Sequence, residues 1–317
     1  MSSKIQNWIS SLKGKRTAVI GIGVSNTPLI RMLLRAGISV TACDKNEREL
    51  FGGLAAELES LGACLQLGEH YLDHLNQNVI FRTPGMRPDH PALVEAAKHG
   101  SVITSEMEIF FQVCPCEILA VTGSDGKTTT ATIIAKLLKA AGYTTYLGGN
   151  IGKPLLSEAG DMLPEDKVVL ELSSFQLMSM RQSPQVAVVT NLAPNHLDLH
   201  ASMKEYIAAK ENIYLYQGPE GKLVVNHDND TTRGFANKAK GKVVYFGRLN
   251  PPKEGVLLED DVICVRRNGI SRQILPISDI LLPGMHNVEN YMAAIAATSA
   301  LAKADAVERV AKTFAGG

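Results

Sequence analysis

One stretch of the chain combines a strand, a glycine-rich loop and a helix, and it limits the folds available to this half of the molecule. An apolar run from Ile118 to Thr122 leads into the loop Gly123–Thr128, read Gly-Ser-Asp-Gly-Lys-Thr, and a helical pattern follows at once. Glycines let backbone N–H groups approach phosphate oxygens closely, Lys127 can neutralise phosphate charge, and the Thr128 hydroxyl can ligate Mg²⁺. The layout therefore predicts a nucleoside triphosphate site in an α/β domain.

The loop is shorter than the general phosphate-binding loop, because Val121 stands where that motif has its first glycine. The shorter form, Gly-x-x-Gly-Lys-Thr, resembles the loops of the Mur ligases and folylpolyglutamate synthases, which couple ATP cleavage to amide-bond formation. The loop by itself does not choose between these two families.

Length and charge narrow the class of protein. A chain of 317 residues predicts two domains, and 32 basic residues balance 32 acidic ones. This balance argues against a basic nucleic-acid face or a polybasic membrane anchor, and no apolar run is long enough to cross a bilayer. The five cysteines have no metal-binding spacing, so they are expected to be reduced thiols. We therefore expect a cytoplasmic protein, and we expect it to be a monomer.

Alternating strand and helix signals divide the chain into two predicted α/β domains. The first, residues 1–112, is expected to be a Rossmann-like domain that binds a UDP-substrate. The second, residues 113–317, carries the glycine loop on a largely parallel sheet, because several of its strands are apolar throughout. Short alternating strands in residues 247–283 predict a small antiparallel insert, and a helix is expected from Val288 to Lys303.

The first domain opens with a strand followed by Gly21-x-Gly23-x-x-Asn26, and the next strand ends at Asp44. This pattern is similar to a dinucleotide fingerprint, but Asn26 replaces the third glycine, which weakens the interpretation as an NAD site. A helix N-terminus can bind any diphosphate, so a UDP-sugar fits equally well. The turn at residues 83–85 could meet the uridine or the diphosphate. A Rossmann-like fold with an idle first turn is the alternative.

Polar residues in the second domain follow predicted strands, where ligands of open α/β sheets bind. Glu171 ends one buried strand and is a candidate Mg²⁺ ligand, although a structural acid is the simpler interpretation. His196 follows the next strand and, as a neutral imidazole, could be a second metal ligand. A glycine-rich loop around Asn150 adds an amide that can donate and accept hydrogen bonds.

Lys210 lies on the apolar face of a predicted helix. Ser202-Met-Lys-Glu205 predicts a helix start, and helical spacing then places Lys210 beside Tyr206 and Tyr214. A desolvated lysine has a lowered pKa, and a neutral amine can react with CO₂ to give an anionic carbamate ligand. The spacing alone favours a simpler interpretation, in which the lysine reaches solvent from the edge of the helix.

The run Glu171–Leu177, read Glu-Leu-Ser-Ser-Phe-Gln-Leu, discriminates most strongly among known families. With Gly149–Gly152, His196–Asp198, Ala209-Lys210 and His286–Asn290 in the expected order, the whole chain resembles the Mur ligase family of peptidoglycan synthesis, and within it the D-glutamate-adding ligases.

The resemblance implies roles for individual residues. The ATP phosphates would contact Gly123, Ser124, Asp125, Gly126, Lys127, Thr128 and Thr129. The adenine side would be reached by Asn287 and Asn290. One Mg²⁺ would be held by Thr128 and Glu171, and a second by His196 and carbamylated Lys210. UDP would contact Ser25, Asp44, Thr83, Pro84 and Gly85, and the muramoyl-alanine part would face Asn150 and Ser173. The catalytic set would be Lys127, Glu171, His196 and Lys210.

The implied reaction consumes ATP, UDP-N-acetylmuramoyl-L-alanine and D-glutamate. The γ-phosphoryl group passes to the alanyl carboxylate, and the amine of D-glutamate displaces phosphate from the resulting acyl phosphate. The family also has a third domain with the amino-acid site, which does not follow Gly317 in this sequence. We therefore expect that this chain binds the UDP-substrate but turns over poorly or not at all.

Three alternatives remain from the residues. The chain could be an L-alanine-adding Mur ligase, a two-domain NAD(P)-binding protein with an unrelated NTPase half, or a non-catalytic nucleotide-binding module. Binding of NAD, or of nucleotides with no response to muramoyl-alanine, would distinguish the last two from a ligase.

Overall fold

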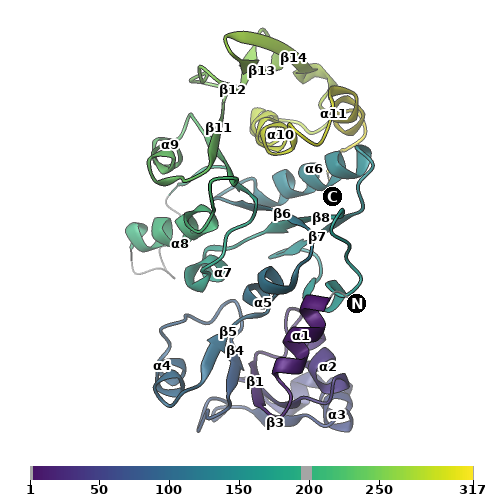
Figure 1. Cartoon of the computed structure of the whole chain (residues 1–317), viewed down its shortest axis with the longest axis vertical. Helices are drawn as coiled ribbons and strands as arrows, with labels where there is room; N and C mark the ends of the chain where they lie inside the picture. The colour runs from purple at the N-terminus through teal and green to yellow at the C-terminus, as the bar shows by residue number, and fades with distance from the viewer. Residues whose placement is uncertain (1–2, 194–201, 317) are drawn as a thin grey trace. The chain divides into compact units, whose positions relative to one another are not determined.

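The computed structural model describes residues 3–193 and 202–316 and divides the chain into two compact units (Figure 1). The first unit comprises Met1–Pro115 and Lys153–Leu163, and the second comprises Cys116–Gly152 and Pro164–Gly317. The division predicted at residues 112 and 113 assigns Lys153–Leu163 to the second domain, whereas the structure groups this segment with the first unit. Within that unit, the buried Glu106 carboxylate accepts a hydrogen bond from the Leu156 backbone N–H at 3.0 Å.

The first unit contains a five-stranded, wholly parallel sheet in the order β3-β2-β1-β4-β5. Its strands are β1 (Arg16–Ile20), β2 (Ser39–Asp44), β3 (Cys64–Leu67), β4 (Val79–Phe81) and β5 (Val102–Thr104). The helices are α1 (Ser3–Ser11), α2 (Thr27–Arg35), α3 (Gly53–Ser60), α4 (Pro91–Lys98) and α5 (Glu106–Val113), with 3₁₀ turns η1 (Arg48–Phe51) and η2 (Leu156–Glu158). This order matches the first five strands of the Rossmann order 3-2-1-4-5-6, in agreement with the predicted Rossmann-like fold.

The second unit contains a nine-stranded sheet in the order β14-β13-β12-β11-β10-β9-β6-β8-β7. The parallel strands are β6 (Glu117–Thr122), β7 (Thr145–Gly149), β8 (Lys167–Glu171), β9 (Val186–Val189), β10 (Lys222–Asn226), β11 (Lys242–Gly247) and β12 (Gly255–Glu259). The strand β13 (Val262–Arg267) pairs antiparallel with β12, and β14 (Ile270–Pro276) pairs antiparallel with β13 at the edge of the sheet. The predicted α/β architecture with a small antiparallel insert is therefore confirmed.

Helices of the second unit follow most of its parallel strands. They are α6 (Lys127–Ala140), α7 (Ser174–Ser179), α8 (Met203–Leu215), α9 (Asp230–Gly234), α10 (Met285–Thr298) and α11 (Ala304–Ala311), with 3₁₀ turns η3 (Phe235–Lys238) and η4 (Ile277–Asp279). The predicted helix from Val288 to Lys303 was wrong at both ends. It starts at Met285 and ends at Thr298, whose carbonyl accepts hydrogen bonds from the Leu301 and Ala302 N–H groups as the chain turns toward α11.

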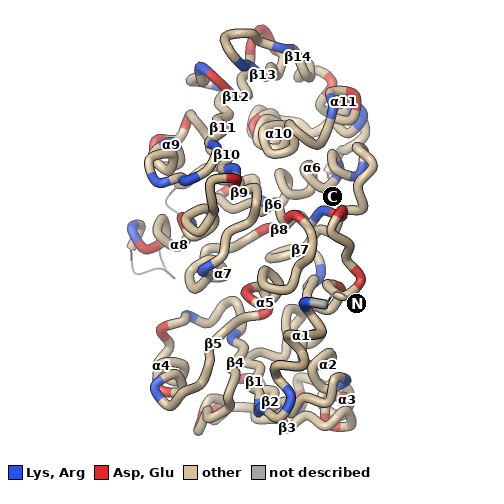
Figure 2. Tube along the Cα trace, in the orientation of Figure 1, with Lys and Arg blue, Asp and Glu red and all other residues tan. Residues whose placement is uncertain are grey.

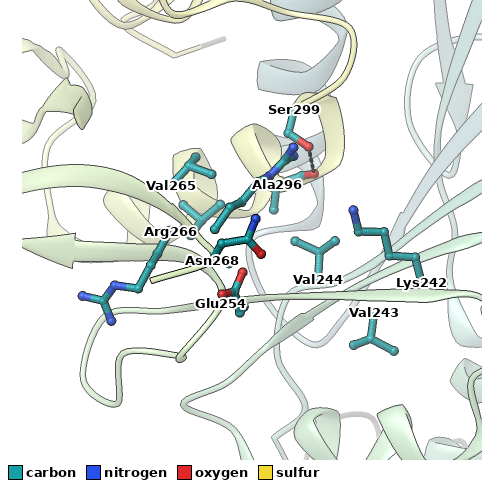
Figure 3. Close-up of a pocket in the computed structure, with 12 residues that line it drawn as sticks. Lys242, Val243, Val244, Glu254, Val265, Arg266, Asn268, Ala296 and Ser299 are labelled. Carbon is teal, nitrogen blue, oxygen red and sulfur yellow. Dashed lines mark hydrogen bonds between the residues drawn. The ribbon is translucent and has the colours of Figure 1, made fainter. Parts of the chain in front are cut away.

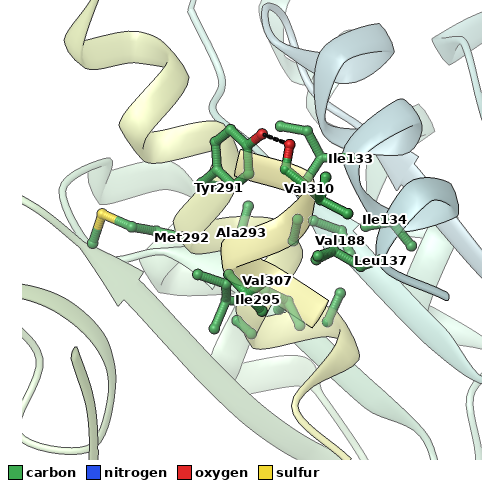
Figure 4. Close-up of a cluster of buried hydrophobic side chains, with 14 of the residues drawn as sticks. Ile133, Ile134, Leu137, Val188, Tyr291, Met292, Ala293, Ile295, Val307 and Val310 are labelled. Carbon is green, nitrogen blue, oxygen red and sulfur yellow. Dashed lines mark hydrogen bonds between the residues drawn. The ribbon is translucent and has the colours of Figure 1, made fainter. Parts of the chain in front are cut away.

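The core of the second unit lies between the sheet and the helices α6, α10 and α11. Figure 4 shows Ile133 and Leu137 of α6 close to Tyr291 and Ile295 of α10. The Tyr291 hydroxyl donates to the Val310 carbonyl of α11 at 3.5 Å, so the one polar atom of this ring has a partner. Packing of α6 against α10 holds the glycine loop, at the start of α6, in a fixed place beside the start of α10.

Basic and acidic residues are interspersed along the trace of each unit (Figure 2), in agreement with the balanced composition. None of the helices formed by the described residues has the length and apolar character that a bilayer crossing requires.

Leu137 provides a test of this core, because its side chain is fully buried between α6 and α10. We expect Leu137→Ala to lower the free energy of unfolding by about 2–5 kcal/mol through lost burial and a residual cavity. Lys139→Ala, at an exposed position of the same helix, is the matched control and should change it by less than about 0.5 kcal/mol. Denaturant titration checks both, and equal effects of the two substitutions would contradict this packing.

Candidate functional site

The glycine loop lies between the end of β6 and the start of α6, at the carboxyl ends of the neighbouring parallel strands β8 and β9. Gly123 has φ +151°, and a Cβ on it would overlap with the Thr190 hydroxyl. That hydroxyl in turn donates to the Asp125 carbonyl at 2.6 Å. Because Gly123 has no side chain, the loop can lie directly against Thr190 and Asn191, the segment that directly follows β9.

The far end of the loop contacts the start of α10. Gly126 is the N-cap of α6 in the left-handed conformation, and a Cβ on it would overlap with the Asn290 amide oxygen. The same oxygen accepts from the Thr130 hydroxyl at 3.2 Å, and the Asn290 amide nitrogen donates to Asn287 Oδ1 at 3.0 Å. Asn287 and Asn290, predicted from the sequence to lie on the adenine side, are thus placed beside the glycine loop.

A pocket of about 150 Å³ opens beside this contact. Its lining includes Gly126, Asn191, Phe246, His286, Glu289 and Asn290. The Glu289 carboxylate is paired with Arg248, whose Nε donates to it at 2.8 Å. Sequence reasoning missed Phe246 and Glu289, because nothing in their local patterns indicates that β11 and α10 meet at the glycine loop.

Asp228 fixes the loop that carries Arg248. Its carboxylate accepts from the backbone N–H groups of Arg248, Leu249 and Asn250 at 2.7, 3.0 and 2.7 Å. This arrangement holds the segment after β11 against the pocket, and sequence reasoning missed it as well. The signal was a lone aspartate two residues after a strand, which is too common to predict such a role.

Lys127 is held by a carbonyl of the glycine loop, and Asp125 by a side chain of the segment after β9. The Lys127 ammonium donates to the Ser124 carbonyl at 2.8 Å, and the Asp125 N–H donates to Asn191 Oδ1 at 3.0 Å. Thr129 lies in the first turn of α6. A cation and the first-turn N–H groups of α6 therefore share one end of the helix, which is the arrangement that binds phosphate groups.

Glu171 meets Thr128 and Asn150 at the end of β8. The Thr128 hydroxyl donates to Glu171 Oε2 at 2.6 Å, and the Asn150 amide donates to Oε1 at 3.0 Å. The Glu171 side chain is buried, so both carboxylate oxygens are held in place. A hydroxyl and a carboxylate side by side are the hard oxygen ligands that Mg²⁺ prefers, and these residues fit one such ion.

Lys210 is buried, and the interpretation of a lysine that reaches solvent was wrong. Only 2% of its surface is exposed, and its ammonium donates to the Gly123 carbonyl at 2.9 Å and to the Thr122 hydroxyl at 3.2 Å. Burial, and to a smaller extent the nearby cation of Lys127, lower the pKa of Lys210 to about 7, although Glu171 opposes the shift. Close to neutral pH a substantial fraction of this amine is therefore unprotonated and nucleophilic.

Tyr206, one turn before Lys210 on α8, links the lysine to the glycine loop. Its hydroxyl lies 3.0 Å from the Ser124 hydroxyl, and the Lys210 nitrogen lies 4.8 Å from the centre of its ring. The helical spacing indicated that these residues share a face, but it could not indicate that the face covers the glycine loop. The helix begins at Ser202, whose hydroxyl accepts from the Glu205 N–H at 3.2 Å, as predicted.

Ser173 is the N-cap of α7 and forms a complete capping box with Gln176. Its hydroxyl accepts from the Gln176 N–H at 3.2 Å, and its own N–H donates to the Gln176 side-chain oxygen at 2.9 Å. The run that discriminates among families thus contains a helix start directly after Glu171. Contact between Ser173 and a substrate stays a prediction.

His196 lies outside the described residues, so its predicted place in a second metal site is not described. Among the residues of 3–193 and 202–316, no group of three or more histidine, cysteine or acidic side chains could enclose a metal ion. The residues that come together around the glycine loop are Thr128, Asn150, Glu171, Lys210, Asn287 and Asn290.

In the first unit, Asp44 supports the turn between β1 and α2. Its carboxylate accepts from the Ile22 N–H at 2.7 Å and from the Asn46 N–H at 2.9 Å. Ser25 is half-buried in that turn. Asn26 is buried and donates to the Ile20 carbonyl at 2.9 Å, while its Oδ1 has no partner among the described residues. A side chain thus occupies the place where a dinucleotide fingerprint needs a glycine for close packing.

The turn Thr83, Pro84 and Gly85 follows β4 and is held by a buried arginine that sequence reasoning missed. The Arg82 guanidinium donates to the Met86 carbonyl at 2.9 Å and to those of Thr83 and Pro84 at 3.5 Å. Burial lowers the pKa of Arg82, and nearby Glu108 opposes that shift. The predicted UDP-binding residues therefore lie at the carboxyl ends of neighbouring strands β1, β2 and β4.

Comparisons with known proteins agree with this geometry. The sequence profile of the Mur ligase middle domain matches residues 121–298. The UDP-N-acetylmuramoylalanine–D-glutamate ligase of Acetivibrio thermocellus is 50% identical over the whole chain, which covers 68% of that relative. The enzyme of the same name from Clostridium novyi is 48% identical over the same span and the same share of its length.

Solved structures share the fold at lower identity. A UDP-N-acetylmuramate:L-alanyl-γ-D-glutamyl-meso-diaminopimelate ligase from Neisseria meningitides superposes with a TM-score of 0.64 at 21% identity, over 96% of this chain and 99% of that one. A UDP-N-acetylmuramate–alanine ligase from Thermotoga maritima gives a TM-score of 0.53 at 24% identity, over 95% and 69% of the two chains.

Burial of Lys210 predicts a pH dependence of stability. Its pKa is about 7 in the folded chain and ordinarily 10.5, so the unfolded chain binds more protons between these values. The free energy of unfolding should therefore rise with pH above 7, by up to about 1.4 kcal/mol per pH unit from this group. Below pH 7 the cost of the buried charge is fully present.

Denaturant titration from pH 7 to 9 in CO₂-free buffer measures this effect against Lys210→Met, which cannot titrate. We expect the free energy of unfolding of the wild type to increase relative to that of Lys210→Met as the pH rises. A difference that does not change with pH would mean that Lys210 keeps an ordinary pKa.

Proposed function

We propose that this chain, which belongs to the Mur ligase family, acts in the ATP-dependent joining of D-glutamate to UDP-N-acetylmuramoyl-L-alanine, a cytoplasmic step of peptidoglycan precursor synthesis. Two relatives named for D-glutamate ligation are 48–50% identical over the whole chain and match it over 68% of their own length. The observation that carries the proposal is the convergence of Lys127, Thr128, Glu171 and Lys210 around one glycine loop.

The glycine loop would hold the phosphates of ATP. Backbone N–H groups at the start of α6 would face the phosphate oxygens. The Lys127 ammonium, which donates to the Ser124 carbonyl in the structure, would instead contact the phosphoryl group that is transferred. The adjoining pocket beside Asn290, with Phe246 and His286 in its lining, would hold the adenine. Phosphoryl transfer requires mainly position and charge stabilisation, and these residues supply both.

The metal ligands would come from two places. Thr128 and Glu171 would hold one Mg²⁺, which neutralises phosphate charge when it is bound. Lys210, with its pKa near 7, would react as the free amine with CO₂. Its carbamate would give an anionic oxygen ligand for a second Mg²⁺ together with His196. The amine loses a proton in this reaction, so the lowered pKa favours it.

The acceptor would be the alanyl carboxylate of the UDP-substrate. It takes the γ-phosphoryl group of ATP to give an acyl phosphate, and the amine of D-glutamate then displaces inorganic phosphate. Asn150, which donates to Glu171, and Ser173, which follows Glu171 closely in the sequence, would face the muramoyl-alanine part. Ser25, Asp44 and the turn of residues 83–85 would contact UDP, and the chain would act as a monomer.

Within the family, an L-alanine-adding ligase is the rival assignment. The two differ in substrate, because the L-alanine-adding enzyme binds UDP-N-acetylmuramate without the alanyl group. An NAD-binding first unit is disfavoured by Asn26, whose buried side chain fills the place of the third fingerprint glycine.

Lys127→Ala tests the ATP site. The variant loses the only side-chain cation on the glycine loop itself, so we expect ATP affinity to fall at least tenfold, as measured by calorimetry with Mg²⁺ present. Lys139→Ala, at an exposed position near the end of the same helix, is the control and should leave the affinity unchanged. Equal ATP affinity of the two variants would contradict the assignment of the glycine loop as the ATP site.

Calorimetric titration also tests the substrate. We expect UDP-N-acetylmuramoyl-L-alanine to bind more tightly than UDP-N-acetylmuramate, with no binding of NAD. Equal affinity for the two muramoyl nucleotides would favour the L-alanine-adding assignment. Binding of NAD, or of neither muramoyl nucleotide, would contradict the assignment of the first unit.

A further inference from the structure

One pocket of the second unit lies far from the glycine loop. It has a volume of about 580 Å³ and is bounded by β13, β14, the carboxyl end of α10 and the start of α11. Asn287 and Asn290 lie near the opposite end of α10, and a helix of 14 residues is about 21 Å long. The pocket therefore belongs to neither the predicted ATP site nor the metal ligands.

The floor of this pocket is apolar. Val265 and Ile274 on the hairpin face Ile295 of α10 and Val307 of α11, and the last two side chains are 3% exposed. The volume falls in the range of pockets that take small organic ligands. A ligand with an apolar body would therefore cover side chains that now border open space.

Three cations surround that floor. Arg267 of β13, Arg272 of β14 and Lys303 before α11 all line the pocket, and its lining contains no acidic residue. In the strand register Arg267 pairs with Ile270 and Val265 pairs with Arg272, so the two arginines are diagonal neighbours on one face of the hairpin. Within the described residues none of the three has an ion-pair partner. Neighbouring like charges repel one another, and an anion bound among the three cations would relieve the repulsion.

The helix ends beside the pocket are consistent with an anion. Lys303, the N-cap of α11, makes no side-chain capping hydrogen bond, so the first N–H groups of that helix have no side-chain acceptor there. The carboxyl end of α10 would repel an anion, but Lys222 compensates it by donating to the carbonyls of Ala296 and Ala297 at 3.3 and 2.6 Å.

A smaller pocket on the same hairpin provides a contrast. Figure 3 shows this pocket of about 220 Å³, which includes Glu254 among its lining residues. Arg266 points away from Ala296 and Ser299 there, and its guanidinium is paired with Glu259. An acidic lining residue and a paired arginine make the smaller pocket a poor anion site, whereas the larger pocket has neither.

We propose that the pocket between the β13–β14 hairpin and the helices α10 and α11 binds a small organic phosphate with an apolar body. Two guanidinium forks and the start of α11 offer donors to a tetrahedral head group, and the floor covers the apolar part. The cations and the apolar floor together define the ligand class. Inorganic phosphate would leave the apolar floor exposed, and an alcohol would leave the three cations without an anion.

The test is a calorimetric titration of the full chain with hexyl phosphate, compared with inorganic phosphate, 1-hexanol and hexanoate. Lys127→Ala serves as the background, so that the glycine loop does not contribute. We expect saturable binding of one hexyl phosphate per chain, at least tenfold tighter than inorganic phosphate or hexanol and tighter than hexanoate.

Variants then locate the site. Arg267→Gln and Arg272→Gln, both at exposed positions, should each weaken hexyl phosphate binding at least tenfold. Arg266→Gln, on the other face of the same strand, is the matched control and should leave it unchanged. Absence of saturable binding, equal binding of inorganic phosphate, or equal effects of all three substitutions would overturn the proposal. Tighter binding of hexanoate would overturn the choice of phosphate.

Discussion

Close approach of backbone segments around Gly123 is the constraint on which the second unit depends. A Cβ there would overlap with the Thr190 hydroxyl, so the absence of a side chain allows the loop to lie against the segment that directly follows β9. The Gly123 carbonyl then accepts a hydrogen bond from Lys210 of α8, and at the other end of the loop Gly126 lies against Asn290 of α10. One short loop thus brings together helices that are far apart in the sequence.

This arrangement buries a positive charge at an energetic cost. Lys210 has two hydrogen-bond acceptors but lies near the cation of Lys127, and both burial and repulsion favour its neutral form. A fold selected for stability alone would more easily place an apolar residue at this position. The unusual environment is therefore best understood as serving chemistry at the glycine loop, where Glu171 and Thr128 already share a hydrogen bond.

Local patterns predicted the elements but not all of the contacts between them. The glycine loop, the apolar strands and the start of α8 at Ser202 each carry their own signal, so the α/β fold and the burial face of Lys210 were accessible from the sequence. Phe246, Arg82 and Asp228 were missed, because their roles come from contacts between distant segments or from a common residue at a strand end. The predicted end of α10 was wrong because Leu301, Ala302 and Lys303 all favour a helix, whereas the chain turns after Thr298.

The most direct test of the central claim is carbon-13 NMR of the chain equilibrated with ¹³C-bicarbonate at pH 8. If burial makes Lys210 a reactive neutral amine, the wild type should show a carbamate resonance that Lys210→Arg lacks. The resonance should also weaken as the pH is lowered below 7, because protonation competes with carbamate formation. A folded wild-type chain with no carbamate resonance, or one that persists in Lys210→Arg, would contradict the account.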